Sequence, residues 1–156
     1  MENDKKFLLM AIKIASKSID TGGGPFGAVI VKDGKLISEG HNRVVQTTDP
    51  TAHAEILAIR EAAKNLNSHD LKDCTLYTSC EPCPMCLGAI YWSGIKTVVF
   101  ASDRNDAEEG GFSDKLIYDE IALDPGDRKI SFIRIIGIGG KEVFRKWNRL
   151  EDKIPY

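Results

Sequence analysis

The amino-acid sequence predicts one α/β domain, with helices on both faces of a mixed sheet whose first two strands are antiparallel. Its 156 residues are the size of a single domain, and no repeat, low-complexity tract or linker divides them. Strand-like apolar runs alternate along the chain with segments whose apolar residues recur at helical spacing. This alternation is typical of layered α/β folds, so we expect residues 1–156 to form one domain.

The N-terminal half predicts a helix, a β-hairpin and a second helix. The first helix should bury residues at helical spacing, namely Phe7, Ala11, Ile14, Ala15 and Ile19. After the break at residues 22–25, strands over 26–32 and 35–41 are joined by a tight turn at Asp33-Gly34. A polar loop over 42–51 follows. The helix that begins near Ala52 should then bury Ile56, Ile59, Ala62, Ala63 and Leu66.

The C-terminal half predicts three strands and three helices. The strands are expected at residues 74–79, 97–101 and 130–136, the second of them buried. The helices are expected from Pro82 onward, over 113–121 and over 142–150. The sheet and its helices would therefore use the full length of the chain.

Composition argues against several classes of partner. The net charge is -2 and the sequence pI is about 5.9, so the chain has no overall attraction for nucleic acid or for an anionic membrane. No apolar run approaches the length of a membrane span, and the N-terminus lacks the features of a secretory signal. We therefore expect a cytoplasmic protein whose four cysteines are reduced thiols.

Four residues carry a recognisable chemistry. His53 is followed by Glu55, and Cys83 and Cys86 lie thirty residues further on in the run SCEPCPMC. One imidazole and two thiolates make three zinc ligands, and three ligands with one open position are typical of catalytic zinc, which activates water there. Glu55 need not bind the metal, so its carboxylate is free to handle protons.

The positions of these side chains on the predicted helices are only partly clear. Cys83 and Cys86 are three residues apart, so their sulfurs should share one face near a helix N-terminus, where the thiolate is favoured. His53 and Glu55 are two residues apart, about 200° around an ideal helix. Either His53 lies in an irregular first turn, or the two side chains reach the metal from opposite flanks.

Cys80 leaves a second ligand set open. It extends the pattern to C-x-x-C-x-x-C, so Cys80, Cys83, Cys86 and His53 together would make a closed, four-ligand structural site. In that arrangement Glu55 would have no role.

Three segments resemble the cytidine deaminase-like superfamily of zinc enzymes: PFGAVIVKDG, DPTAHAEILAIR and LYTSCEPCPMCLGAIYW. They contain the H-x-E and P-C-x-x-C signature of zinc-dependent nucleobase deaminases. The resemblance implies a three-layer α/β/α fold with a central five-stranded mixed sheet, and a dimer or larger oligomer. It also implies one Zn²⁺ per subunit, bound by His53, Cys83 and Cys86, with Glu55 as the proton shuttle.

The segment ASDRNDAEEGGFSDKLIYDEI at 101–121 is similar to the bacterial guanine deaminase branch of this superfamily. That similarity implies that Asp114 accepts hydrogen bonds from a purine, that Asn42 contacts the polar edge of the base, and that Phe26 stacks on its ring. It further implies that a C-terminal tail, about 151–156, crosses to the partner subunit of a homodimer, where Tyr156 helps to close the site.

Guanine suits these residue types, because a carboxylate accepts well from its adjacent N1–H and 2-amino donors. We therefore expect hydrolytic deamination of guanine to xanthine and ammonia. The main alternative is a tRNA adenosine deaminase, whose phosphate contacts would come from Lys141, Arg145 and Arg149. A related free base, nucleoside or triazine is a further candidate substrate, and a non-enzymatic zinc-stabilised binding module is the remaining alternative.

Overall fold

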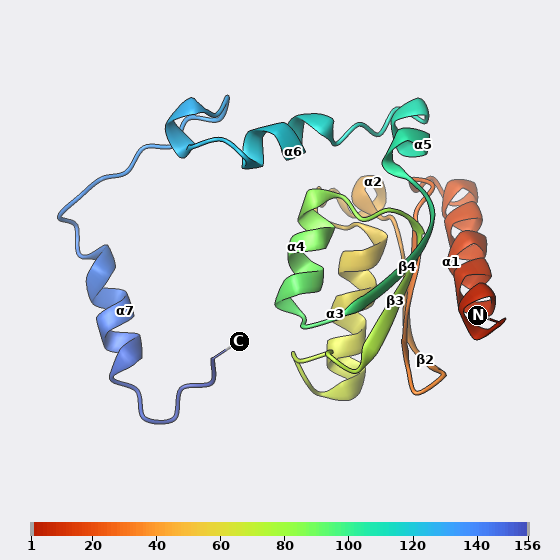
Figure 1. Cartoon of the computed structure of the whole chain (residues 1–156), viewed down its shortest axis with the longest axis horizontal. Coiled ribbons are helices and arrows are strands. Elements are labelled where there is room, and N and C mark those ends of the chain that lie inside the picture. Colours follow the sequence, from red (N-terminus) through yellow and green to blue (C-terminus); the bar gives the residue numbers. More distant parts are fainter. Residues whose placement is uncertain (1, 156) are drawn as a thin grey trace. The chain divides into compact units, whose positions relative to one another are not determined.

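A computed structural model describes residues 2–155 of the chain (Figure 1). The chain divides into two compact units, Met1–Lys115 and Leu116–Tyr156. The first unit contains all the strands that the structure describes. No helix within residues 2–155 is both long enough and apolar enough to span a bilayer.

The first unit is built on a four-stranded mixed sheet with the order β2-β1-β3-β4. Its strands are β1 (Gly27–Lys32), β2 (Lys35–His41), β3 (Cys74–Cys80) and β4 (Thr97–Ser102). Strand β1 pairs antiparallel with β2 and β3, and β3 pairs parallel with β4. The predicted hairpin turn is confirmed: Asp33 and Gly34 have φ of 49° and 71°, both left-handed, as a type I′ turn requires.

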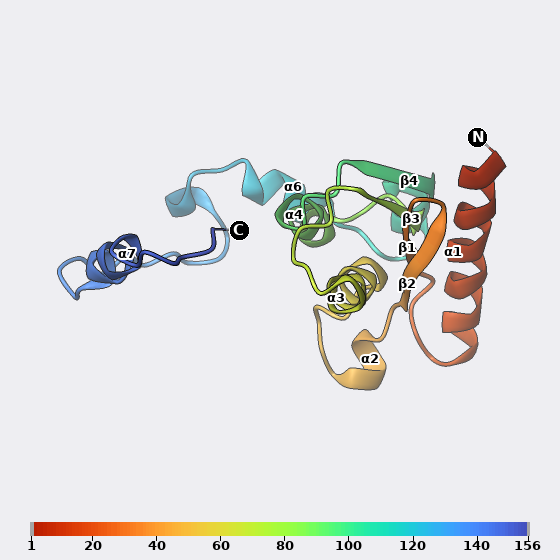
Figure 2. The same ribbon diagram turned by 90° about the horizontal axis from the view of Figure 1, so that it is seen from below.

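Helices cover both faces of the sheet. Helix α1 (Glu2–Asp20) lies on one face, and α3 (Ala54–Leu66) and α4 (Pro84–Trp92) lie on the other (Figure 2). Alternate residues of β1 serve the two layers, because successive side chains of a strand point to opposite faces. Val29 and Val31 pack in one core with Phe7 of α1, while Ala28 and Ile30 pack in the other with α3 and α4. The predicted three-layer α/β architecture is confirmed for this unit.

Glycine allows the helices to pack closely on the hairpin strands. A Cβ atom at Gly40 of β2 would lie 2.2 Å from the backbone oxygen of Ala54, in the first turn of α3. A Cβ at Gly27 of β1 would lie 2.4 Å from the backbone oxygen of Ala11 in α1. Real Cβ contacts are never this short, so Gly40 fixes how closely the N-terminus of α3 approaches the sheet.

The expected fifth strand at 130–136 is absent from the described chain. Those residues belong to the second unit and pair with no strand. Apolar β-branched residues favour an extended backbone, but a strand also needs a neighbour whose backbone groups it can bond. Strand β4 is therefore the edge of the sheet and not a buried strand as expected, and its Phe100 is 44% exposed.

Local capping explains most of the shifted helix boundaries. Helix α4 begins at Pro84 and not at Pro82, because Cys83 is the N-cap and proline is favoured at the first helical position. The polar loop contains a short helix, α2 (Val44–Thr47), that the sequence did not predict. Helix α5 (Arg104–Glu109) was also missed, although Asp103 and Asp106 form a capping box at its start. Ile19 of α1 is exposed, contrary to expectation.

The second unit consists of short helices and extended segments. Helix α6 (Lys115–Ile121) begins at the last residue of the first unit and continues into the second. It is followed by the 3-10 turn η1 (Pro125–Asp127) and by α7 (Gly140–Asn148). The Arg128 guanidinium donates to the backbone oxygens of Glu120 and Leu123, both at 3.1 Å. None of the described residues from Leu116 onward is buried, so this unit has no core of its own.

Replacing Gly40 by alanine should destabilise the protein by about 3 kcal/mol, since the added methyl group meets the backbone of α3 and overpacking of this kind costs 1–3 kcal/mol or more. Chemical denaturation followed by circular dichroism measures the change. Gly126→Ala is the matched control, because a Cβ there has no atom within 4 Å. A Gly40→Ala protein as stable as the control would contradict the proposed close contact.

Candidate active site

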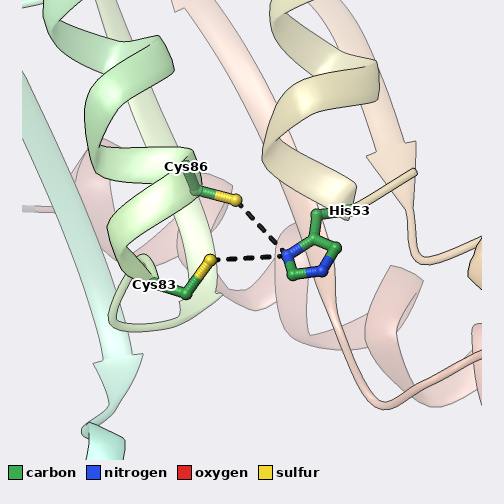
Figure 3. A group of neighbouring side chains, drawn as sticks. All are labelled: His53, Cys83 and Cys86. Carbon is green, nitrogen blue, oxygen red and sulfur yellow. Dashed lines mark hydrogen bonds between the residues drawn. The ribbon is translucent and has the colours of Figure 1, made fainter. Parts of the chain in front are cut away.

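Three metal-ligand side chains meet between the starts of α3 and α4. His53 is the N-cap of α3, Cys83 is the N-cap of α4, and Cys86 lies in the first turn of α4. The Sγ atoms of both cysteines lie 3.5 Å from Nδ1 of His53 (Figure 3). The potential ligand atoms of the three residues all lie within 4.8 Å of one another. The structure thus brings together the three residues that the sequence singled out.

The spacing of these atoms fits a tetrahedral metal. With Zn–S of about 2.3 Å and Zn–N of about 2.0 Å, tetrahedral angles place sulfur and nitrogen about 3.5 Å apart. The two S···N distances of 3.5 Å agree with this value. The donor set of one imidazole and two thiols also suits zinc. Three protein ligands leave a fourth position for water or substrate.

The relation between His53 and Glu55 is explained by the start of α3. His53 precedes the first helical residue and has an extended backbone, with φ of -73° and ψ of 154°. Glu55 lies in the first turn of α3. Because His53 lies outside the helix, the angle of about 200° between residues two apart in an ideal helix does not apply to this pair. The first of the two alternatives, an irregular position for His53, is the one that the structure adopts.

The pKa values of the two cysteine thiols shift in opposite directions. A hydrogen bond from Cys86 lowers the pKa of Cys83 to about 4. The same hydrogen bond raises the pKa of Cys86. A hydrogen bond between Cys83 and His53 raises the pKa of His53. Because a ligating cysteine must be a thiolate, a bound cation would displace the remaining thiol proton.

Glu55 is a buried carboxyl beside this group. It is 4% exposed, and burial raises its pKa. Its Oε1 accepts a hydrogen bond from the hydroxyl of Thr78 at 3.0 Å, and its Oε2 accepts one from Sγ of Cys86 at 3.4 Å. A carboxyl with raised pKa at hydrogen-bond distance from a metal ligand is well placed to accept and return protons.

Asn42 is buried, and hydrogen bonds fix the orientation of its amide. Its Oδ1 accepts from the backbone N–H groups of Gly24 and Val44, both at 3.3 Å. Two donors on one atom identify it as the oxygen, which leaves the NH₂ group as the donor for a ligand.

Asp114 is half-buried just before α6, where burial raises its pKa. The charge of Cys83 raises the same pKa further. The Asp114 carboxyl therefore lies within the electrostatic influence of His53, Cys83 and Cys86, called the metal group below.

Two aromatic rings lie together near the break after α1. Phe26 meets Phe112 edge-to-face, with centroids 5.0 Å apart, and Phe112 is a contact that the sequence analysis missed. Its position in the GFSD segment, two residues before Asp114, was the available signal. Tyr156, the remaining predicted site residue, lies outside the described residues.

Cys80 does not join the metal group. Its Sγ donates to the backbone oxygen of Asp103 at 3.5 Å, and it lines a cavity of about 390 Å³ together with Phe26 and Phe112. None of the three metal-group residues lines that cavity. Burial raises the pKa of the Cys80 thiol to about 11, which keeps it protonated. The closed four-ligand alternative is therefore not formed.

Residues 1–102 match the model of the cytidine and deoxycytidylate deaminase zinc-binding region. The chain belongs to this deaminase family. The match ends with β4, so it includes both helix starts that carry the metal group. Zinc is accordingly the metal expected at His53, Cys83 and Cys86.

The individual relatives differ in how much of the chain they match. A guanine deaminase of Bacillus subtilis (strain 168) is 49% identical over 155 residues, which cover 99% of both proteins. A tRNA-specific adenosine deaminase of Aquifex aeolicus (strain VF5) is 46% identical over 105 residues, covering 67% of this chain and 68% of the relative. The X-ray structure of guanine deaminase from Bacillus subtilis superposes with a TM-score of 0.95 at 49% identity, covering 97% of this chain and 98% of the other.

Purified protein should contain one zinc ion per chain, and Cys86→Ser should lose most of it during dialysis against a chelator, because a hydroxyl is a poor zinc ligand. Elemental analysis measures the zinc. Cys80→Ser is the matched control, a second buried cysteine in the same segment that is expected to keep its metal. Zinc loss from Cys80→Ser equal to that from Cys86→Ser would restore the four-ligand alternative.

Proposed function

We propose that this chain is a zinc-dependent aminohydrolase that converts guanine and water to xanthine and ammonia. The observation that carries the proposal is the extent of similarity to guanine deaminase, which includes the second unit as well as the metal-binding region. The metal group alone does not select a base, because deaminases of different bases use the same zinc signature. Selectivity must therefore come from residues outside that group.

His53, Cys83 and Cys86 are proposed as the zinc ligands and Glu55 as the proton shuttle. When bound, zinc lowers the pKa of a water molecule and so supplies the nucleophile at neutral pH. Glu55 accepts the proton from that water and delivers a proton to N3 of the purine. It then takes the proton of the hydroxyl that has added to C2 and donates it to the amine that leaves C2, so that C2 becomes a carbonyl carbon of xanthine. The burial that raises the pKa of Glu55 makes its carboxylate a better base for this first step.

Asn42 and Asp114 are proposed to read opposite edges of guanine. The free NH₂ of Asn42 is a donor for the acceptors O6 and N7, while the Asp114 carboxylate accepts from N1–H and the 2-amino group. Adenine presents no N1–H donor, so it would leave the Asp114 carboxylate without a partner. Phe26 is proposed to pack on the ring, with Phe112 as its aromatic neighbour.

The tRNA alternative has less support. The similarity to the tRNA-specific adenosine deaminase covers 67% of this chain, and the basic stripe of α7 lies in the second unit. Within that stripe Arg145 forms an ion pair with Glu142, so the carboxylate offsets the positive charge of the guanidinium. The net charge of -2 adds no general attraction for RNA.

A homodimer that exchanges the second unit, including the tail at about 151–156, is proposed as the working form. In the first unit, Tyr91 and Trp92 of α4 are 78% and 71% exposed, and the outer edge of β4 is unpaired. The second unit exposes an apolar set of its own: Ile130, Phe132, Ile133, Ile135, Ile136 and Ile138. A second copy that offers its residues 130–136 to β4 would bury both surfaces and provide the fifth strand.

Exchange of this kind would make residues 1–156 a single working deaminase domain, with Tyr156 closing the partner's site. A cytoplasmic location is proposed as well. All four cysteines are free thiols, and thiolate ligands have to remain reduced to hold zinc.

Zinc-loaded protein should release ammonia from guanine and not from adenine, cytosine, cytidine, guanosine or a tRNA anticodon stem-loop. The expected selectivity for guanine over adenine is about 10⁴-fold, since a site built to accept hydrogen bonds rejects analogues that lack the donors. A coupled ammonia assay at equal substrate concentration provides the comparison. Activity confined to the RNA would support the adenosine deaminase alternative and reject the guanine assignment.

Deleting residues 154–156 should lower guanine turnover, and adding a catalytically inactive Glu55→Gln chain should restore it. The inactive chain still carries an intact tail, which can close the site of the truncated partner in a mixed dimer. The two variants are produced together and assayed against each variant alone, with light scattering to confirm the dimer. A mixture no more active than the sum of its components would mean that the tail acts within its own chain.

A further inference from the structure

The environment of Thr78 indicates a role in positioning Glu55. Thr78 lies in β3, the third strand in the order of the sheet, paired to Ala28 of β1 and to Phe100 of β4. Its side chain is 0% exposed, and it points to the same face as Leu76, which packs in the core beneath α3. A valine has the same shape and would suit an apolar core position. A hydroxyl at this place needs a polar partner.

That partner is the Glu55 carboxyl. The hydroxyl of Thr78 donates to Oε1 of Glu55 at 3.0 Å, and both residues are buried. The other carboxylate oxygen, Oε2, faces Cys86 at 3.4 Å and therefore faces the metal group. One oxygen of Glu55 is thus held by the sheet while the other is directed toward the reacting centre.

The two hydrogen bonds differ in what happens when zinc binds. Cys86 can donate only as a thiol, and a cysteine ligand is a thiolate, so metal binding removes its hydrogen bond to Oε2. The hydroxyl of Thr78 does not ionise near neutral pH, so it stays a donor whether or not a metal is bound. In the loaded enzyme the bond from Thr78 is the one of the two that remains.

We propose that Thr78 is a positioning residue that holds Oε1 of Glu55 and so directs Oε2 at the water and the purine N3. This inference rests on the proposed role of Glu55 as proton shuttle. The restricted χ1 rotamers of a β-branched residue and the pairing of β3 on both sides make the donor rigid. Glu55 lies in the first turn of α3, and Thr78 lies in the sheet. The distance between this helix and the sheet therefore sets the direction in which the Glu55 carboxyl points.

The test compares Thr78→Val, which keeps the shape and removes the hydroxyl, with Thr78→Ser, which keeps the hydroxyl and loses a methyl group. Steady-state kinetics on guanine should show kcat of Thr78→Val reduced roughly 10- to 100-fold with KM nearly unchanged, the loss expected for one hydrogen bond to a charged group. Thr78→Ser should stay within about threefold of wild type, as a retained hydrogen bond predicts.

If Thr78 acted through packing alone, Thr78→Ser would lose more kcat than Thr78→Val. Serine leaves a cavity in place of the methyl group, whereas valine keeps the shape of threonine. Thr78→Val with wild-type kcat, or with the loss confined to KM, would overturn the proposal. So would a Thr78→Val protein that has lost its zinc in elemental analysis. If Thr78→Val does not fold, Thr78→Ala is compared with Thr78→Ser, since the two differ only by the hydroxyl, and equal kcat values would reject the idea.

Glu55→Gln separates this inference from the proposed function. It should retain zinc and lower kcat by about 10²- to 10⁴-fold, the usual contribution of a general acid–base group. An active Glu55→Gln enzyme would reject the shuttle itself, whereas an inactive Glu55→Gln beside a fully active Thr78→Val would reject only the role of Thr78.

Discussion

The site depends on one constraint, the convergence of two helix starts. An N-cap side chain normally bonds a free N–H of its own helix, and losing that bond costs about 1 kcal/mol. Neither His53 nor Cys83 makes such a bond. Their side chains face each other across 3.5 Å instead, between helices that belong to the same layer. Each helix gives up a cap so that a metal can link them, and the positive ends of both helices favour the thiolates.

The parts of this arrangement that were predictable follow from local rules. The hairpin was evident because Asp-Gly at a two-residue turn has a specific backbone requirement. The metal residues were evident because their spacing is a chemical signature that does not depend on exact helix boundaries. The boundary at α4 was misplaced because two prolines flank Cys83, and only the backbone shows that Pro84 is the first helical residue. Phe112 and Thr78 were missed because their roles arise from neighbours distant in sequence.

The missing fifth strand shows a different limit. The apolar and β-branched residues at 130–136 led to the prediction of a strand, but pairing depends on the availability of an edge, which no local pattern encodes. A stretch rich in isoleucine and phenylalanine that remains exposed is costly, since each fully buried side chain of this size is worth about 2 kcal/mol. That cost is the physical reason to expect a second copy.

Under the proposed function, proton transfer and base recognition are assigned to different residues. The metal group and the two residues to which proton transfer is assigned, Glu55 and Thr78, are built on β3, α3 and α4 of the first unit. The proposed base contacts Phe26, Asn42 and Asp114 come from other segments of the same unit, and the proposed tail comes from the second unit. A buried carboxyl suits this separation. Burial raises the pKa of Glu55, and the sheet holds one of its carboxyl oxygens through Thr78. As the proposed proton shuttle, Glu55 would therefore serve different purine pockets without a change in its own surroundings.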